Sequence, residues 1–218
     1  MNFTGWQKIS LVDYPKKIST VVFTSGCNFN CLYCHNQLLK NKTSAEITEK
    51  MIYDFFIKRR NTVDALTITG GEPSLYGEEL LDFIHRFRNM FPDKQVKVDT
   101  NGSDTDFLKN LKETADFIAM DFKSTNYGLF SEISDEIIKK SLSILSDFKN
   151  HEVRITVYPY YIPENDFEKI SEIISMSGIK NVSVQQYRPV DNIKPYSINI
   201  LNNFKNILEN KNLSVIIK

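Results

Sequence analysis

All three cysteines of the 218-residue chain, Cys27, Cys31 and Cys34, lie within eight positions. Such clustering is typical of a metal site, because thiolates on one short loop can bind the same metal centre. A closed structural zinc site or an ordinary ferredoxin cluster takes four ligands from the protein. An odd set of three therefore indicates a metal centre with one coordination position left for another molecule.

Two alternatives for the cysteine cluster stay open on the residues alone. His35 follows Cys34 directly and could complete a Cys₃His zinc site, although zinc ligands usually arrive as separated pairs. A non-catalytic electron carrier is the second alternative, but such a protein would normally supply a fourth cysteine. Three closely spaced thiols favour an iron–sulfur centre over both.

A second motif, Gly70-Gly71-Glu72-Pro73, carries residues suited to binding a small molecule. The two glycines let the backbone approach a ligand without a side chain in the way, and Glu72 can accept a hydrogen bond from an ammonium group. Pro73 stiffens the turn. Taken alone, the motif could equally be a turn before a helix, so its functional interpretation depends on the cysteines.

Further polar residues stand at or near the ends of predicted strands. On the residues alone, Asp99 and Asp121 could be only helix caps or charges at the rim of the sheet. Arg154 lies inside a predicted strand and could simply pair with a neighbouring acid. The other two candidates of this group are Asn101 and Lys123.

The elements that hold these residues alternate along the chain. Short β-branched or apolar runs predict strands, and longer segments with apolar residues near a 3.6-residue period predict helices. Thr43, Ser44, Ser134 and Asn165 are expected helix caps. Strands are expected at 19–24, 65–69, 95–99, 117–120, 153–157, 182–186 and 213–217, and helices at 46–59, 78–91, 104–114, 135–150, 165–177 and 198–210.

Alternation of this kind implies parallel strands joined by right-handed crossovers. In such α/β folds ligands gather at the carboxyl ends of the strands, where the cysteines and the glycine motif both fall. The expected fold is an α/β partial (β/α)₆ barrel that forms one domain over residues 1–218. A flat doubly wound sheet is the main competitor.

Composition limits the function classes. A hydrophobic fraction of 41% is enough for a substantial core, and 27 basic against 27 acidic residues give no overall basic footprint for nucleic acid. The N-terminal residues lack the layout of a secretory signal, and no window approaches the roughly 20 apolar residues that span a bilayer. We therefore expect a cytoplasmic protein that binds neither nucleic acid nor membrane, with its thiols kept reduced.

The sequence around the cysteines resembles a known family. The segment CNFNCLYC has the CxxxCxxC pattern of radical S-adenosylmethionine (SAM) enzymes, and GGEP resembles their motif for the methionine part of SAM. The segments GWQK, SLVDYP and VVFTSG before the cysteines, and Cys34-His35-Asn36 after them, are similar to activating proteins of anaerobic ribonucleoside-triphosphate reductases, which are glycyl-radical-enzyme activases. Two departures are Lys16, where glycine is expected, and Leu32, where proline is common.

The resemblance implies a [4Fe-4S] cluster, SAM and a monovalent cation, with fifteen residues that contact them. Cys27, Cys31 and Cys34 would bind three irons of a [4Fe-4S] cluster, and the amino and carboxylate groups of SAM would bind the fourth. No catalytic side chain is implied beyond the cluster and SAM. The resemblance places Tyr33 beside the adenine, Asp99 and Asp121 around a monovalent cation, and Lys123 and Arg154 near carboxylate or ribose oxygens; His35, Asn36, Gly70, Gly71, Glu72, Pro73 and Asn101 complete the implied cofactor-binding residues.

The implied reaction is reductive cleavage of SAM, after which a 5′-deoxyadenosyl radical takes a hydrogen atom from a glycine of a partner enzyme. Anaerobic ribonucleoside-triphosphate reductase is the implied partner, and flavodoxin or ferredoxin the implied electron donor. Two alternatives remain: a radical SAM enzyme acting on a small molecule, similar to 7-carboxy-7-deazaguanine synthase, and a non-catalytic metal-binding or electron-transfer module.

Overall fold

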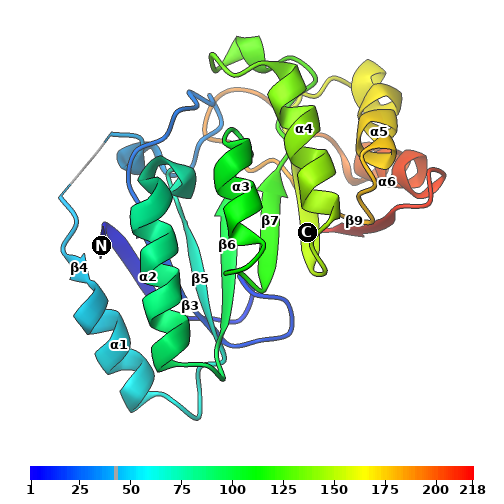
Figure 1. Cartoon of the computed structure of the whole chain (residues 1–218). Helices are drawn as coiled ribbons and strands as arrows, with labels where there is room; N and C mark the ends of the chain where they lie inside the picture. Colours follow the sequence, from blue (N-terminus) through cyan, green and yellow to red (C-terminus); the bar gives the residue numbers. More distant parts are fainter. Residues whose placement is uncertain (42–43) are drawn as a thin grey trace. The chain divides into compact units, whose positions relative to one another are not determined.

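The computed structural model describes residues 1–41 and 44–218 (Figure 1). Two compact units interleave along the chain. Unit 1 comprises residues 1–28, 36–100 and 106–118, and unit 2 comprises residues 29–35, 101–105 and 119–218. The prediction of a single domain over residues 1–218 stays a prediction.

Unit 1 contains a sheet with the strand order β6-β5-β3-β2. Val22 of β3 lies opposite Ile68 of β5, and β5 pairs in the same parallel sense with β6. The edge strand β2 runs antiparallel to β3. The bounds are β2 (Gly5–Ser10), β3 (Ser19–Thr24), β5 (Ala65–Gly70) and β6 (Gln95–Thr100), and a small separate sheet pairs β1 (Asn2–Phe3) with β4 (Ile47–Thr48).

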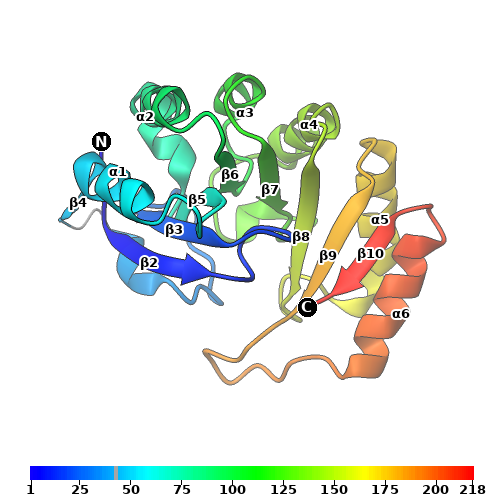
Figure 2. The same cartoon turned by 90° about the horizontal axis from the view of Figure 1, so that it is seen from below.

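Three helices of unit 1, α1 (Glu49–Lys58), α2 (Gly77–Met90) and α3 (Thr105–Leu111), lie on one face of this sheet (Figure 2). On one side of each helix the apolar residues recur at helical spacing and are buried, among them Ile52 of α1, Leu80 of α2 and Leu108 of α3. Each such side chain contributes roughly 1.5–3 kcal/mol by leaving water. The rings of Phe56 and Phe87 join α1 to α2 with centroids 4.8 Å apart in an edge-on arrangement.

Unit 2 contains the strand order β10-β9-β8-β7. The pairs β8–β9 and β9–β10 are parallel. The stacked rings of Phe167 and Phe204, with centroids 4.2 Å apart, join α5 to α6. The bounds are β7 (Phe117–Asp121), β8 (His151–Val157), β9 (Asn181–Gln186), β10 (Ser214–Ile217), α4 (Asp135–Ser146), α5 (Phe167–Met176) and α6 (Ile198–Glu209), and residues 119–121 of β7 belong to unit 2.

Every strand and helix expected from the sequence is present, with shifts at the ends. Ser134 caps α4 as predicted, because its side chain accepts a hydrogen bond from the Ile137 amide. The cap of α1 is Thr48 and not Ser44, and Asp166 rather than Asn165 precedes α5. The expected cap Thr43 lies outside the described residues.

Short 3₁₀ helices complete the connections: η1 (Gln37–Leu39), η2 (Pro73–Tyr76), η3 (Tyr127–Leu129) and η4 (Glu164–Asp166). Two of them matter for the site, because η1 follows the cysteines and η2 begins inside the glycine motif. No helix in the described ranges is long and apolar enough to span a bilayer.

Candidate functional site

Cys27 lies just after the end of β3 in unit 1, and the backbone before it is fixed by hydrogen bonds. Gly26 has a φ of 82°, a conformation that favours glycine, and so turns the chain out of the strand. The Gly26 amide donates to the Leu39 carbonyl at 2.7 Å, and the Cys27 amide donates to the Lys40 carbonyl at 3.2 Å. The backbone after η1 therefore folds back on the start of the cysteine loop, residues 27–34, and fixes it.

The glycine motif is bonded to the same segment. The Gly71 amide donates to the Thr24 carbonyl at 2.9 Å, and the Glu72 amide donates to the Gly26 carbonyl at 2.8 Å. A Cβ atom on Gly71 would lie 1.9 Å from the Gly26 oxygen, and Gly70 has a φ of 131°. These glycines thus permit a close approach to the backbone that precedes Cys27, while their contact with a cofactor stays a prediction.

Glu72 is buried, and its carboxylate is held by two donors. Its Oε1 atom accepts from the Ser74 amide at 3.1 Å and from the Thr100 hydroxyl at 2.6 Å. The first bond caps η2, in which Pro73 is the first residue. A carboxylate fixed by its own turn and by the end of β6 is well placed to receive an ammonium group.

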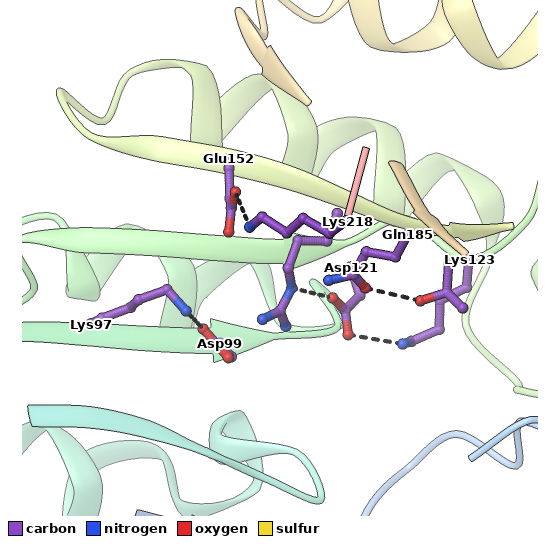
Figure 3. Close-up of polar contacts among 9 residues, drawn as sticks. Lys97, Asp99, Asp121, Lys123, Glu152, Gln185 and Lys218 are labelled. Carbon is purple, nitrogen blue, oxygen red and sulfur yellow. Dashed lines mark hydrogen bonds and ion pairs between the residues drawn. The ribbon is translucent and has the colours of Figure 1, made fainter. Parts of the chain in front are cut away.

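Asp99 lies on β6 beside a residue that the sequence analysis did not select. The Lys97 ammonium donates to the Asp99 carboxylate (Figure 3). Both side chains are almost fully buried. The two positions share one face of the strand because side chains alternate along it, so a lysine within an apolar run two residues before an aspartate was a usable signal.

In unit 2 the rest of the cysteine loop is anchored by the chain around η3 and by the residues after β8. The Phe29 ring packs edge-on against Phe130, with centroids 5.6 Å apart, and the Asn30 amide donates to the Phe130 carbonyl at 2.7 Å. The Leu32 amide donates to the Tyr161 hydroxyl at 3.1 Å. The loop conformation is thus set by packing and backbone bonds.

The three cysteines form no disulfide with one another, and Cys31 is buried whereas Cys27 and Cys34 are partly exposed. Within residues 1–41 and 44–218, no three His, Cys, Asp or Glu side chains form a group that could hold a metal ion. His35 and Asn36 are exposed. The donor chemistry nevertheless fits an iron–sulfur cluster, because three reduced, soft ligands sit on one short loop with a fixed backbone.

Tyr33, between the last two cysteines, belongs to a buried tyrosine cluster formed with Tyr158, Tyr161 and Tyr187. Its ring centroid lies 5.1 Å from that of Tyr158 and 5.7 Å from that of Tyr161. The Lys123 ammonium lies 5.8 Å from the Tyr33 centroid, within the range of a cation–π contact. Burial raises the pKa of Tyr33, so its phenol stays neutral.

One carboxylate ties the tyrosine cluster to the loop after β9. The Tyr158 and Tyr187 hydroxyls donate to the two oxygens of Asp191 at 2.6 and 2.7 Å. These bonds lower the pKa of Asp191. Asp191 therefore stays ionised and holds two of the rings around Tyr33.

Asp121 at the end of β7 is bonded by two cations. Arg154 Nε donates to one carboxylate oxygen at 2.7 Å. Lys123 Nζ donates to the other at 3.0 Å (Figure 3). Burial by itself raises the pKa of Asp121, but the two cations outweigh it and hold the pKa well below its usual range. Arg154 thus pairs with an acid, and the group keeps one excess positive charge that suits an anionic ligand.

Asn101 is buried and shapes the turn after β6. Its Oδ1 accepts from the Ser103 amide at 2.9 Å, and the next residue, Gly102, has a φ of 74°. A Cβ on Gly102 would lie 2.2 Å from the Met120 methyl carbon. The structure gives Asn101 a role in this turn, and its contact with a cofactor stays a prediction.

Comparison with known proteins identifies the family. A family model described as the radical SAM superfamily matches residues 21–176, well over half of the chain. A protein of Methanocaldococcus jannaschii named as a glycyl-radical enzyme activating enzyme is 32% identical over 203 residues, which are 86% of this chain and 80% of that protein. The chain belongs to the glycyl-radical-enzyme activating enzymes of the radical SAM superfamily.

Other relatives agree with this assignment. This chain is 28% identical over 205 residues to a pyruvate formate-lyase-activating enzyme of Listeria monocytogenes, and the match covers 83% of this chain and 79% of that protein. A crystal structure of a radical SAM methyltransferase from Sphaerobacter thermophilus superposes with a TM-score of 0.70 at 15% identity, covering 94% of this chain and 67% of that chain. The predicted α/β fold of radical SAM type is confirmed, and the family implies a [4Fe-4S] cluster and SAM.

The assignment also removes one alternative, since an activating enzyme is not a non-catalytic module. Three residues that hold the proposed site residues in place were not predicted from the sequence. Thr100 orients Glu72, Lys97 pairs with Asp99, and Asp191 holds two tyrosines. Only Lys97 carried a signal in the sequence, because the other bonds join residues far apart along the chain.

Proposed function

We propose that this chain cleaves SAM reductively and generates a glycyl radical on a partner enzyme. The observation that carries the proposal is the backbone connection between its two motifs: the Gly71 and Glu72 amides donate to Thr24 and Gly26, directly before Cys27. A metal-binding loop and a ligand-binding turn are thereby held in one fixed relation. Family membership supplies the chemistry that such a pair of motifs supports.

Cys27, Cys31 and Cys34 are the residues that we propose hold the cluster. When bound, a [4Fe-4S] cluster supplies the electron that breaks the bond between sulfur and the ribose 5′-carbon of SAM, so that the released 5′-deoxyadenosyl radical takes hydrogen from a glycine. The anchored loop fixes the thiols. Glu72, oriented by two donors, accepts from the ammonium group of SAM.

The residues of unit 2 provide the remaining proposed contacts with SAM. Lys123 and Arg154 carry one positive charge beyond that balanced by Asp121, which supports binding of carboxylate or ribose oxygens. Tyr33 is held by its neighbours and offers a ring to the adenine. The contacts with the cofactors that were expected of His35, Asn36, Gly70, Pro73 and Asn101 stay predictions.

Two partners are supported by different observations. The segments that flank the cysteines resemble activating proteins of anaerobic ribonucleoside-triphosphate reductases, so that enzyme is the first candidate. The likeness to pyruvate formate-lyase-activating enzymes makes a formate-lyase the second. Flavodoxin or ferredoxin is the proposed electron donor, and the cytoplasm the proposed compartment.

Anaerobic reconstitution with iron and sulfide, followed by SAM and a reductant, tests the reaction. We expect 5′-deoxyadenosine, and a glycine-centred doublet in electron paramagnetic resonance when one of the two partners is added. A fully loaded protein that yields no 5′-deoxyadenosine would refute the proposed reaction. Cleavage of SAM without a doublet on either partner would refute the proposed partners alone.

Two variants test the site. Cys31→Ala should lose the cluster and SAM cleavage together, because it removes a buried ligand. Glu72→Gln should keep the cluster and weaken SAM binding by about tenfold, because the amide keeps the shape and loses the charge. Glu78→Gln, at an exposed position on α2, is the matched control and should behave as wild type. Normal SAM affinity in Glu72→Gln would remove Glu72 from the site.

A further inference from the structure

Lys97 is a lysine in the interior of unit 1. Its side chain is 2% exposed, and that of its partner Asp99 is 7% exposed. The neighbouring Val96 and Val98 are fully buried on the opposite face of β6, so the strand is covered on both sides. A lysine at such a position is costly unless its charge is paired, and a buried apolar residue would normally stand there.

The ammonium is directed to Asp99 although another polar atom lies nearby. Thr67 on β5 stands opposite Lys97 in the parallel register, so the two side chains share a face of the sheet. The buried Thr67 hydroxyl has no hydrogen-bond partner in the described part of the chain. The Lys97 ammonium nevertheless donates to the Asp99 carboxylate two positions along its own strand.

The resemblance to activating proteins predicted a monovalent cation held by Asp99 and Asp121, and the donor chemistry does not fit one. A sodium or potassium ion at a carboxylate is held by the attraction of its negative charge, and a cation already paired with that carboxylate opposes this attraction. In unit 1 the charge of Asp99 is balanced by Lys97, and in unit 2 both oxygens of Asp121 receive bonds from Arg154 and Lys123. A further cation at either carboxylate would meet the repulsion of a fixed positive charge.

We propose that the Lys97 ammonium takes the place of a monovalent cation at Asp99, so that SAM binding by this chain requires neither sodium nor potassium. The inference rests on the proposed function in one respect, namely that SAM binds at the end of β6. Lys97 is then a positioning residue, because it holds Asp99 with an ammonium group that is covalently attached to the chain. Such a charge does not exchange with the medium.

Equilibrium binding of SAM to the reconstituted protein tests this proposal. In a buffer whose only cation is tetramethylammonium, which is too large to replace a small cation at a buried carboxylate, wild type should bind SAM as tightly as with potassium or sodium added. Lys97→Met should bind about tenfold more weakly in that buffer and recover with potassium, because Asp99 is then available to a small cation. A wild-type affinity that rises tenfold with potassium overturns the proposal. So does a Lys97→Met variant with wild-type affinity in both buffers.

A second comparison separates a folding defect from the proposed role. Lys97→Met leaves Asp99 buried without its cation, whereas Lys97→Met combined with Asp99→Asn removes both charges and so avoids that cost. The double variant should fold, bind SAM weakly and show no response to potassium. A double variant that regains affinity with potassium contradicts the assignment of the cation effect to Asp99.

A third experiment uses no SAM, so it can distinguish failure of this proposal from failure of the proposed function. The thermal midpoint of the apoprotein should be equal in potassium and tetramethylammonium buffers for wild type, and higher in potassium for Lys97→Met. If wild type fails to bind SAM at all, the proposed function fails while this arm still decides the role of Lys97. Equal midpoints for Lys97→Met in both buffers would overturn that role.

Discussion

Replacing Gly71 by alanine tests the connection between the glycine motif and the cysteine loop. The new Cβ would lie 1.9 Å from the Gly26 oxygen and 2.7 Å from the Gly26 carbonyl carbon, where ordinary contact begins near 3.4 Å. Both are backbone atoms, so no side-chain rotation relieves the clash. The two segments must separate by about 1.5 Å, the difference between the clash and ordinary contact.

The structure sets the expected size of the effect. Separation on this scale breaks the bonds from the Gly71 and Glu72 amides, which measure 2.9 and 2.8 Å. At about 1 kcal/mol for each hydrogen bond, the free energy of unfolding should fall by about 2–3 kcal/mol once local strain is added. Cys27 follows Gly26 directly and would shift by about 1 Å, whereas metal–ligand distances hold within about 0.2 Å.

Urea denaturation of the apoprotein and iron content after reconstitution measure the two consequences. We expect a lower midpoint and the loss of most bound iron. Gly128→Ala is the matched control, because its Cβ meets only the end of the Asn126 side chain, at 3.3 Å, and its backbone is not in the left-handed region. If Gly71→Ala retained wild-type iron and stability within about 0.5 kcal/mol, the inferred backbone connection would be wrong.

Three further predictions concern other parts of the chain. Tyr161→Phe keeps the ring but removes the acceptor of a cysteine-loop amide, so unfolding should cost about 1 kcal/mol less and the cluster should be lost faster, while Tyr160→Phe, at an exposed position, should change neither. Lys16→Gly should increase the free energy of unfolding by roughly 1 kcal/mol, because Lys16 has a φ of 61° that only glycine adopts freely. The midpoint of thermal unfolding should rise accordingly. Burial raises the pKa of Glu49, but hydrogen bonds from Arg86 and the amino terminus outweigh burial and lower the pKa from 4.5 to about 2. The stabilisation by Glu49 is therefore complete above pH 4.5 and lost as the pH falls toward 2. Glu49→Gln should make the free energy of unfolding depend less on pH in that interval, and an unchanged slope would contradict the assignment.

The fold was predictable wherever a strand or helix carried a strong apolar pattern. The first predicted strand matches β3 residue for residue, because its β-branched run ends at the polar start of the cysteine loop. The edge strand β2 was not predicted, since three of its six residues are exposed and its sequence is too polar to show a strand signal. Likewise β1 and β4 are two residues long, below what any pattern can show.

The site was predictable in its cysteines and its glycine motif, because both are local in the sequence. The contacts that hold them are not local. The Thr100 hydroxyl reaches Glu72 across 28 positions, and the Tyr158 hydroxyl reaches Asp191 across 33. No spacing rule covers bonds that only the folded sheet brings together, so these residues needed the structure.

The clash that forbids a side chain at Gly71 has a consequence for protein engineering. A designer who transplants the cysteine loop into another scaffold must carry the glycine turn with it as one block, because each segment supplies the hydrogen-bond partners of the other. A transplant of the cysteine loop alone would reproduce the residue spacing of the motif and lose the backbone conformation of the loop.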